Sequence, residues 1–257
     1  MQGSFDCPGE ETTIHKAVEV FRTATGIIEG LTVEVDKHIP TMAGLGGGSA
    51  DAAATLVALD RIFETRLGKD KLATLGAAIG SDVPFFLFGG AAIVSGRGDV
   101  IEPIAPRTDL GLLLLYPGFG VSTKWAYLRL DEWRQQGKAS RPNEVVGPVS
   151  MQEREKMIAA FNAPPETWNF RNSFEEILLP AFPVYRTIKS CFFESGAHFV
   201  SVTGSGSCIY GVYASWEGAL AAKGMLRLAL SAVHTENTLS SMALHAIKPL
   251  ETSLFLG

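Results

Sequence analysis

Residues 44–53 read GLGGGSADAA, with four glycines in five positions followed by a serine and helix-forming residues. Glycine costs backbone entropy, so this run indicates that the backbone must come close to another group. The first amides of a helix lack intrahelical acceptors and lie at the positive end of the helix dipole. Glycines there allow several N–H groups to converge on one anion. The stretch therefore predicts a phosphate site, most simply for a nucleoside triphosphate; a flexible loop or tight turn is the alternative.

Ser49, at the end of the glycine run, is expected to cap the following helix or to donate a hydrogen bond to a phosphate. A Walker A loop needs a lysine after its last glycine, and none follows here. A dinucleotide fingerprint needs a glycine where Ser49 stands, the sixth residue counted from Gly44. The H-R-D and D-F-G signatures of protein kinases are also missing. The glycine run therefore indicates a phosphate loop of another kind.

Two further stretches contain residues suited to chemistry. Asp82 lies in GSDVPFF, where a carboxylate serves either as a general base or as a turn residue, and the sequence leaves both open. The stretch TGSGS, residues 203–207, predicts a tight turn between two strands. The five histidines and three cysteines show neither metal-ligand spacing nor a CxxC motif. Reduced thiols are therefore expected, without a disulfide framework or a side-chain metal site.

The composition is typical of a globular chain, since 46% of the 257 residues are hydrophobic and 19% are charged. The net charge of -5 argues against a duplex nucleic-acid partner, which favours a basic face. The longest aliphatic run, residues 110–116, is too short to span a bilayer. The first eleven residues resemble neither a signal peptide nor a transit peptide. A cytoplasmic protein with neither a membrane nor a nucleic-acid partner is expected.

The spacing of apolar residues predicts the elements that position these motifs. A strand at Leu31–Val35 is expected before the glycine run, and helices at 49–63 and 69–79 after it. The core face of the first of these helices is expected to contain Leu56, Leu59, Ile62 and Phe63. Further helices are expected at 14–22, 183–194 and 216–233, strand pieces within 89–104, and strands at 110–116, on both sides of a turn within 198–213, and at 242–247. The polar stretch 131–168 receives no assignment.

Residues 40–53, PTMAGLGGGSADAA, resemble the P-x-x-x-G-L-G-[GS]-[GS]-S phosphate loop of the GHMP kinases, the galactokinase, homoserine, mevalonate and phosphomevalonate kinase superfamily. Residues 80–99 and 202–213 are similar to two further blocks of one branch. That branch phosphorylates a hydroxyl of 4-diphosphocytidyl-2-C-methyl-D-erythritol with ATP, in non-mevalonate isoprenoid (terpenoid) biosynthesis. The resemblance implies a two-domain α+β fold. An ATP-loop domain is expected over 1–105 and a ferredoxin-like domain, with helices on one face of its sheet, over 106–257.

The resemblance also implies roles for individual residues. Asp82 is expected to be the general base, and a supporting turn is expected at Gly204, Ser205 and Gly206. Magnesium is implied as the companion of ATP rather than by any visible ligand set. The residues expected to surround the ATP phosphates are Pro40, Thr41, Met42, Ala43, Gly44, Leu45, Gly46, Gly47, Gly48, Ser49 and Ala50.

Residues 116–130, YPGFGVSTKWAYLRL, resemble the stretch where the family places an aromatic ring against the cytosine. Tyr127 is the candidate for this ring, with an ordinary core tyrosine as its alternative interpretation and Trp125 as the other candidate. Lys37 is expected near the phosphates or, alternatively, as a solvated lysine at the end of a strand. Ala50 stands where many members of the family have a second serine, a minor change for a loop that binds through its backbone.

The sequence also departs from the family pattern. Members begin with a block similar to A-x-A-K-x-N-L and then a G-Y-H segment, and this chain contains neither. The expected fold therefore lacks its first strands, and weak nucleotide binding and poor kinase activity are expected. A non-catalytic ATP-binding remnant is the alternative from a different class, and a homoserine- or mevalonate-type kinase is the alternative within the superfamily. No oligomeric state is predicted.

Overall fold

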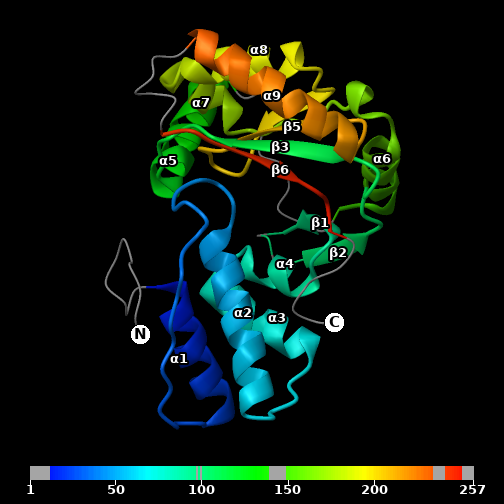
Figure 1. Cartoon of the computed structure of the whole chain (residues 1–257). Coiled ribbons are helices and arrows are strands. Elements are labelled where there is room, and N and C mark those ends of the chain that lie inside the picture. Colours follow the sequence, from blue (N-terminus) through cyan, green and yellow to red (C-terminus); the bar gives the residue numbers. More distant parts are fainter. Residues whose placement is uncertain (1–11, 97, 99, 139–148, 234–240, 251–257) are drawn as a thin grey trace.

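The computed structural model describes residues 12–96, 98, 100–138, 149–233 and 241–250. In Figure 1, helices of the N-terminal half form the lower part of the molecule, and a four-stranded sheet with its covering helices forms the upper part. The N-terminal half contains α1 (Thr13–Thr25), α2 (Gly47–Ile62), α3 (Lys69–Ile79), α4 (Val83–Phe88) and the antiparallel hairpin of β1 (Ala91–Ser95) and β2 (Val100–Ile104).

Helix α1 follows from local signals in the sequence. The hydroxyl of Thr12 accepts a hydrogen bond from the backbone N–H of His15 at 3.1 Å, which caps the helix. Gly26 ends it in the left-handed conformation, with φ of 74°. The apolar positions on one helix face, predicted from their spacing, are all buried: Ile14, Ala17, Val18 and Phe21. Ala17, Val18 and Phe21 belong to a core shared with α2, and the apolar face that the spacing predicts is therefore buried.

Helix α2 differs from its expected form in two respects. It begins at Gly47, inside the glycine run, because Gly46 reverses the chain with φ of 66°. Ser49 therefore lies in the first turn, and no side chain caps this helix. Leu56 and Leu59 are buried as expected, but Ile62 is 67% exposed. Ile62 is six positions after Leu56, so it lies roughly 120° around the helix from Leu56 and outside the face that packs in the core.

The prediction of a strand at Leu31–Val35 is wrong. The structure has only an isolated bridge at Glu34 in this stretch. Alternation of apolar and polar residues indicates an extended chain with one buried face, but a strand also needs a hydrogen-bonded neighbour. Within the described part of the chain, no strand lies beside Leu31–Val35, and the single bridge at Glu34 does not extend into a ladder. The helix at Lys69–Ile79 has the bounds that the sequence predicts.

The C-terminal half is built on an antiparallel sheet. Its strands are β3 (Gly111–Tyr116), β4 (Phe199–Val202), β5 (Ile209–Tyr213) and β6 (Ala243–Ile247), in the spatial order β4-β5-β3-β6. Helices connect β3 to β4 and β5 to β6, whereas a tight turn connects β4 to β5. This β-α-β-β-α-β connectivity is that of the ferredoxin-like fold. The expected fold of this half is therefore confirmed.

Helices of this half cover one face of the sheet, as Figure 1 shows for α7, α8 and α9. The helices that contribute to the core of this face are α5 (Thr123–Trp133), α7 (Glu175–Ala181), α8 (Val184–Glu194) and α9 (Trp216–Val233). Helix α6 (Met151–Asn162) is not part of this core, and its Phe161 stacks on Trp168. A π-helical turn at Arg134–Lys138 and a 3-10 turn at Pro165–Thr167 complete this half. Helix α6 lies in the stretch left without assignment. Its start is a capping box between Ser150 and Glu153, a signal that could have located it.

The core between sheet and helices is continuous. Leu113 and Leu115 of β3 pack with Ile188 and Phe192 of α8 and with Leu226 of α9. The opposite face of the sheet carries a smaller cluster of Leu110, Phe199 and Val212, against which Trp168 packs. None of the helices in the described part of the chain is long and apolar enough to cross a membrane.

Truncation of a buried side chain on β3 tests this assignment of the core. Leu113 is fully buried, so Leu113→Ala is expected to lower the free energy of unfolding by about 2–5 kcal/mol through lost burial and a cavity. The matched control is Leu228→Ala on α9, where the side chain is 72% exposed and the change is expected to stay within about 0.5 kcal/mol. Urea denaturation of both variants is the measurement. Equal effects at the two positions would contradict the assignment.

Candidate active site

A cavity of about 680 Å³ lies between the two halves of the molecule. Its wall contains Pro40 to Ser49 of the glycine loop, together with Lys37, Asp82, Tyr127 and the pair Gly204 and Ser205. The tertiary structure therefore brings most of the sequence-predicted residues to one place. Ala50, Gly206 and Trp125 are not among the residues that line it.

The glycine loop is held from the C-terminal half through three consecutive carbonyl groups. The backbone N–H of Val121 donates to the Met42 carbonyl at 2.9 Å, and that of Cys208 donates to the Ala43 carbonyl at 3.0 Å. The hydroxyl of Thr203 donates to the Gly44 carbonyl at 3.0 Å. Because successive carbonyls are tied down, the path of the chain into α2 is fixed immediately before the helix begins.

Two glycines of the loop are required by contacts within the protein. Gly44 has φ of 72°, and a Cβ on it would overlap the carbonyl oxygen of Thr203. Gly46 has φ of 66°, and its Cβ would lie 2.6 Å from the Phe86 ring. The sequence indicates that the loop backbone comes close to another group. At Gly44 and Gly46 this group is the rest of the protein, and these contacts shape the loop.

The start of α2 faces this cavity with backbone N–H groups that no helical carbonyl accepts. The first intrahelical bond of this turn runs from the Ala50 N–H to the Gly46 carbonyl at 2.9 Å, so the amides of the preceding helical residues have no intrahelical acceptor. The Thr13 hydroxyl donates to the Gly48 carbonyl at 2.6 Å and ties α1 to this turn. A helix start with this dipole and these amides is suited to a phosphate group.

Asp82 directly precedes α4, and its residue is exposed at the cavity. If it served as a turn carboxylate, it would accept a hydrogen bond from the amides of α4. No such capping bond is present in this described helix. The side chain is thus placed on the cavity wall, where a carboxylate can accept a proton from a bound hydroxyl.

Lys37 also lies on the cavity wall, as an ion pair rather than as a solvated lysine. Its Nζ is 2.7 Å from Oδ2 of Asp51, a residue of α2 that lines the same cavity. The two side chains are 29% and 33% exposed, respectively. The pair holds an ammonium group close to the start of α2.

Tyr127 lies on α5 and is 55% exposed, so the core-tyrosine interpretation is wrong. Its ring packs edge-on against Phe174, with 5.0 Å between ring centroids. Both residues line the main cavity and also a second cavity of about 490 Å³. Trp125 instead packs at 5.7 Å against Phe182, at the edge of the C-terminal core. Of the two candidates, Tyr127 is thus the aromatic residue that reaches the cavities.

Sequence reasoning missed the aromatic residues that join Tyr127. Phe170 and Phe174 line the second cavity, and Phe170 is 37% exposed. They belong to an irregular stretch before α7 without a recognisable motif. No signal in the sequence separates them from core phenylalanines, because their exposure depends on how this stretch crosses the end of the sheet.

The predicted turn TGSGS connects β4 to β5, as expected. Gly204 and Ser205 line the main cavity, and Ser205 shares a 3.1 Å hydrogen bond with the hydroxyl of Thr123 at the start of α5. Gly206 lies behind them, where its N–H donates to the Thr203 carbonyl at 3.0 Å. This second glycine turn therefore contacts both the phosphate loop and α5.

Cys208 follows this turn and is fully buried. Burial raises the pKa of its thiol from its ordinary value near 9 to about 12. The neighbouring Tyr185 hydroxyl donates to the Ser207 carbonyl at 2.9 Å, and burial also raises the pKa of this tyrosine. Cys208 thus serves as a neutral packing residue and not as a thiolate. Within the described ranges, no cluster of three or more His, Cys, Asp or Glu could hold a metal.

Two family patterns match this chain. The GHMP kinases N terminal domain matches residues 12–90, and the GHMP kinases C terminal domain matches residues 152–229. The chain belongs to the GHMP kinases. It is therefore a small-molecule kinase, and ATP is the phosphoryl donor of its family.

Individual relatives narrow the comparison within this family. A 4-diphosphocytidyl-2-C-methyl-D-erythritol kinase of Thermodesulfovibrio yellowstonii is 36% identical over 204 residues, which cover 79% of this chain and 70% of that protein. A crystal structure of a 4-(cytidine 5'-diphospho)-2C-methyl-D-erythritol kinase superposes with a TM-score of 0.65 at 30% identity, over 88% of this chain and 77% of that one. This GHMP kinase therefore belongs to the 4-diphosphocytidyl-2-C-methyl-D-erythritol kinase branch of the family.

A homoserine kinase from Cytophaga hutchinsonii superposes with a TM-score of 0.69, over 98% of this chain and 79% of that one. Its sequence identity is only 16%, so this likeness shows the shared GHMP kinase fold alone. The two kinds of likeness thus carry different information: backbone similarity extends across the superfamily, whereas sequence identity identifies the branch.

Substitution of Gly44 tests the contact between the two glycine turns. Gly44→Ala combines a positive φ of 72° with overlap against the Thr203 carbonyl, whereas Gly26→Ala, with a left-handed backbone at φ of 74°, meets nothing within 4 Å. Gly26→Ala is expected to cost about 1 kcal/mol from backbone strain, and Gly44→Ala clearly more. The melting temperatures with and without ATP are the measurement. Gly44→Ala is also expected to lose the ATP-dependent rise that Gly26→Ala retains; identical behaviour would contradict the contact.

The raised pKa of Cys208 predicts instability at alkaline pH. Above about pH 9 the unfolded thiol loses its proton while the folded thiol keeps it up to about pH 12, so the folded state binds more protons. The free energy of unfolding is therefore expected to fall as pH rises between these values. Urea denaturation at several pH values tests this. Cys208→Ala is expected to show a shallower pH slope, and an unchanged slope would exclude the thiol as its source.

Proposed function

We propose that this GHMP kinase transfers the γ-phosphoryl group of ATP to a hydroxyl of 4-diphosphocytidyl-2-C-methyl-D-erythritol. The observation that carries the proposal is the single cavity in which the glycine loop, Asp82 and Tyr127 meet. The identity of 36% to a kinase named for this substrate supports the choice within the family. The proposal places the chain in non-mevalonate isoprenoid biosynthesis.

The glycine loop and the start of α2 would hold the ATP phosphates. Backbone amides bind phosphate oxygens without a side chain, which agrees with a loop that contains no lysine after its glycines. Lys37, paired with Asp51, would place its ammonium group near the phosphates. The second turn, Gly204 to Gly206, would support the loop from the C-terminal half. We place the boundary between an ATP-loop domain, 1–105, and a C-terminal domain, 106–257, in the link between β2 and β3.

Asp82 would act as the general base. The substrate oxygen attacks the γ-phosphorus, its proton passes to the Asp82 carboxylate, and ADP leaves with the electrons of the broken P–O bond. The carboxylate is suited to this role because it faces the cavity and does not cap α4. A positioned general base contributes about 10²–10⁴-fold to such a proton transfer.

Magnesium fits this cavity as the companion of ATP. Mg²⁺ prefers oxygen ligands and usually combines one or two carboxylates with phosphate oxygens and water. The wall offers oxygen donors in the carboxylate of Asp51 and in the hydroxyl of Ser49, which leaves Asp82 free to accept the proton. These residues would hold the ion, which neutralises charge on the transferred phosphate when bound. The residues of the chain would align the phosphates and the hydroxyl around it.

Tyr127 and its neighbour Phe174 would hold the cytidyl end of the substrate. Their rings lie where the main cavity adjoins the second one, so a long substrate could place its cytosine there and its sugar alcohol near Asp82. Aromatic rings bind a flat base by stacking. The second cavity also contains Phe170 and Arg171, which suit a flat base that carries phosphate groups.

An assay with three acceptors tests the proposed function. The protein is incubated with ATP and Mg²⁺ plus 4-diphosphocytidyl-2-C-methyl-D-erythritol, homoserine or mevalonate, and ADP release and the phosphorylated product are measured. Slow turnover is expected, and with the cytidyl compound alone. Turnover with homoserine or mevalonate would overturn the substrate assignment. ATP binding without turnover of any acceptor would support a non-catalytic ATP-binding protein instead.

Replacement of Asp82 tests the base assignment. Asp82→Asn keeps the shape of the side chain but removes the proton acceptor, so kcat is expected to fall by roughly 10²–10⁴ while the Kd of ATP changes little. The matched control is Asp70→Asn, an exposed residue on α3 that does not line the cavity, and its kcat is expected to stay within about twofold. If Asp82→Asn keeps near-parental turnover, another residue accepts the proton.

A further inference from the structure

The second glycine turn contacts the phosphate loop at several points. Besides the bond from the Thr203 hydroxyl to the Gly44 carbonyl, an ideal Cβ on Gly204 would lie 3.1 Å from the same oxygen. The backbones of the two turns are therefore in direct contact. A small shift of the turn at 203–206 would displace Gly44, and with it the chain that enters α2.

This turn lies at the end of an edge strand, where backbone groups lack a neighbouring strand on one side. Strand β4 is the outermost strand in the order β4-β5-β3-β6. Its last residue, Val202, pairs with Ile209 of β5 on its inner side. Polar groups of the outer edge need other partners, because an unpaired backbone group costs free energy when it is removed from water.

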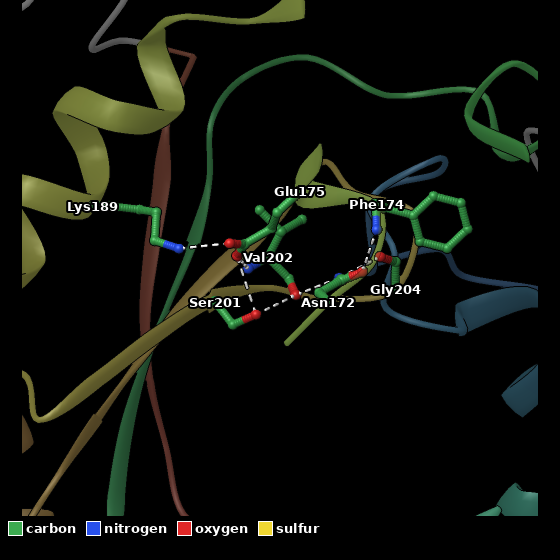
Figure 2. Close-up of polar contacts among 7 residues, drawn as sticks. All are labelled: Asn172, Phe174, Glu175, Lys189, Ser201, Val202 and Gly204. Atoms are coloured by element: carbon green, nitrogen blue, oxygen red, sulfur yellow. Dashed lines mark hydrogen bonds and ion pairs between the residues drawn. The ribbon is translucent and has the colours of Figure 1, made fainter. Parts of the chain in front are cut away.

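Side chains around the start of α7 supply these partners, as Figure 2 shows. The Nδ2 amide of Asn172 donates to the carbonyls of Val202 at 2.8 Å and Gly204 at 2.7 Å. Both of its N–H groups are thus used by the outer edge of the strand and its turn. Its Oδ1 accepts from the backbone N–H of Phe174 at 3.0 Å, which fixes the orientation of the amide.

Glu175 completes the network from the first turn of α7. Its Oε1 accepts from the Val202 N–H at 2.8 Å and from the Ser201 hydroxyl at 3.2 Å. Its Oε2 forms an ion pair with Nζ of Lys189 on α8 at 2.7 Å. Both charged side chains are 20% exposed, so the pair is shielded from solvent more than an ordinary surface pair.

We propose that Asn172 and Glu175 are positioning residues for the kinase reaction, an inference that rests on the ATP-dependent function proposed above. They hold the end of β4 and its glycine turn against the phosphate loop, and through it they align the helix start that binds the ATP phosphates. Neither residue lines the main cavity, so both act on it through Gly204 and Gly44. Asn172 also lines the second cavity, where the cytidyl group is proposed to bind, whereas Glu175 lines neither cavity. An effect on ATP more than on the alcohol substrate is therefore expected for Glu175.

Isosteric replacement of Asn172 separates this role from general stability. Asn172→Asp keeps the acceptor for the Phe174 N–H but replaces both donors with a carboxylate that faces two carbonyl oxygens. The Kd of ATP, measured by calorimetry, is expected to rise about tenfold because the two supporting hydrogen bonds are lost. The Kd of the cytidyl substrate is expected to change as well, because Asn172 lines the second cavity. The control is Asn162→Asp at the exposed end of α6, which should change neither value.

Glu175 provides the second arm of the test. Glu175→Gln retains an acceptor for the Val202 N–H and is expected to keep the Kd of ATP within about threefold, whereas Glu175→Ala is expected to raise it about tenfold. Because Glu175 lines neither cavity, Glu175→Ala is expected to keep the Kd of the cytidyl substrate within about twofold. If Asn172→Asp does not fold, Asn172→Ala removes the donors without adding charge, and the same rise in the Kd of ATP is expected. An unchanged Kd of ATP in the folded Asn172 variant, or equal losses for ATP and the cytidyl substrate in Glu175→Ala, would overturn the inference.

The outcome is independent of the substrate assignment. If the parent protein binds ATP but does not phosphorylate the cytidyl compound, the proposed function fails, while the ratio of ATP affinities between variant and parent still decides the positioning role. If the parent protein binds no ATP, both the inference and the function on which it rests are overturned.

Discussion

The contact between two glycine turns is the constraint on which the site depends. Residues 44 and 204 are far apart in the sequence, yet Gly44 lies against the backbone at 203–206, and the Thr203 hydroxyl donates to the Gly44 carbonyl. This contact ties the helical half to the sheet half at the point where the phosphate loop enters α2. A side chain at Gly44 would separate them, because its Cβ overlaps a backbone carbonyl that cannot move independently of the strand end.

The sheet supplies the rigid side of this contact. Strands β4 and β5 lie over a core that includes Ile188, Phe192 and Leu226, and the turn between them is therefore held at both ends. The outer side of β4 has no neighbouring strand, so its polar groups are satisfied by Asn172 and Glu175 instead. Edge strands need such partners in any fold, but here the groups that cover the edge also determine where the phosphate loop lies.

The same arrangement explains why the chemistry of the site comes from exposed groups. Cys208 and Tyr185 are buried directly behind the second turn, where desolvation keeps them neutral. Asp82, Lys37 and Tyr127 lie on the cavity wall, where a substrate can reach them. Burial thus separates the groups that support the turn from the groups that can react, although all of them lie near one cavity.

The sequence by itself determined the local features: the apolar face of α1, the helix at 69–79, the close backbone approach at the glycine loop and the turn at 203–207. Each depends on spacing or on residues that only one backbone conformation accommodates. Only the tertiary structure decided the rest. Leu31–Val35 alternates like a strand but makes only the single bridge at Glu34 and no ladder with a described strand, since strand pairing is not local. Likewise, Tyr127 reaches the cavity because of where α5 packs, which no spacing within its own segment encodes.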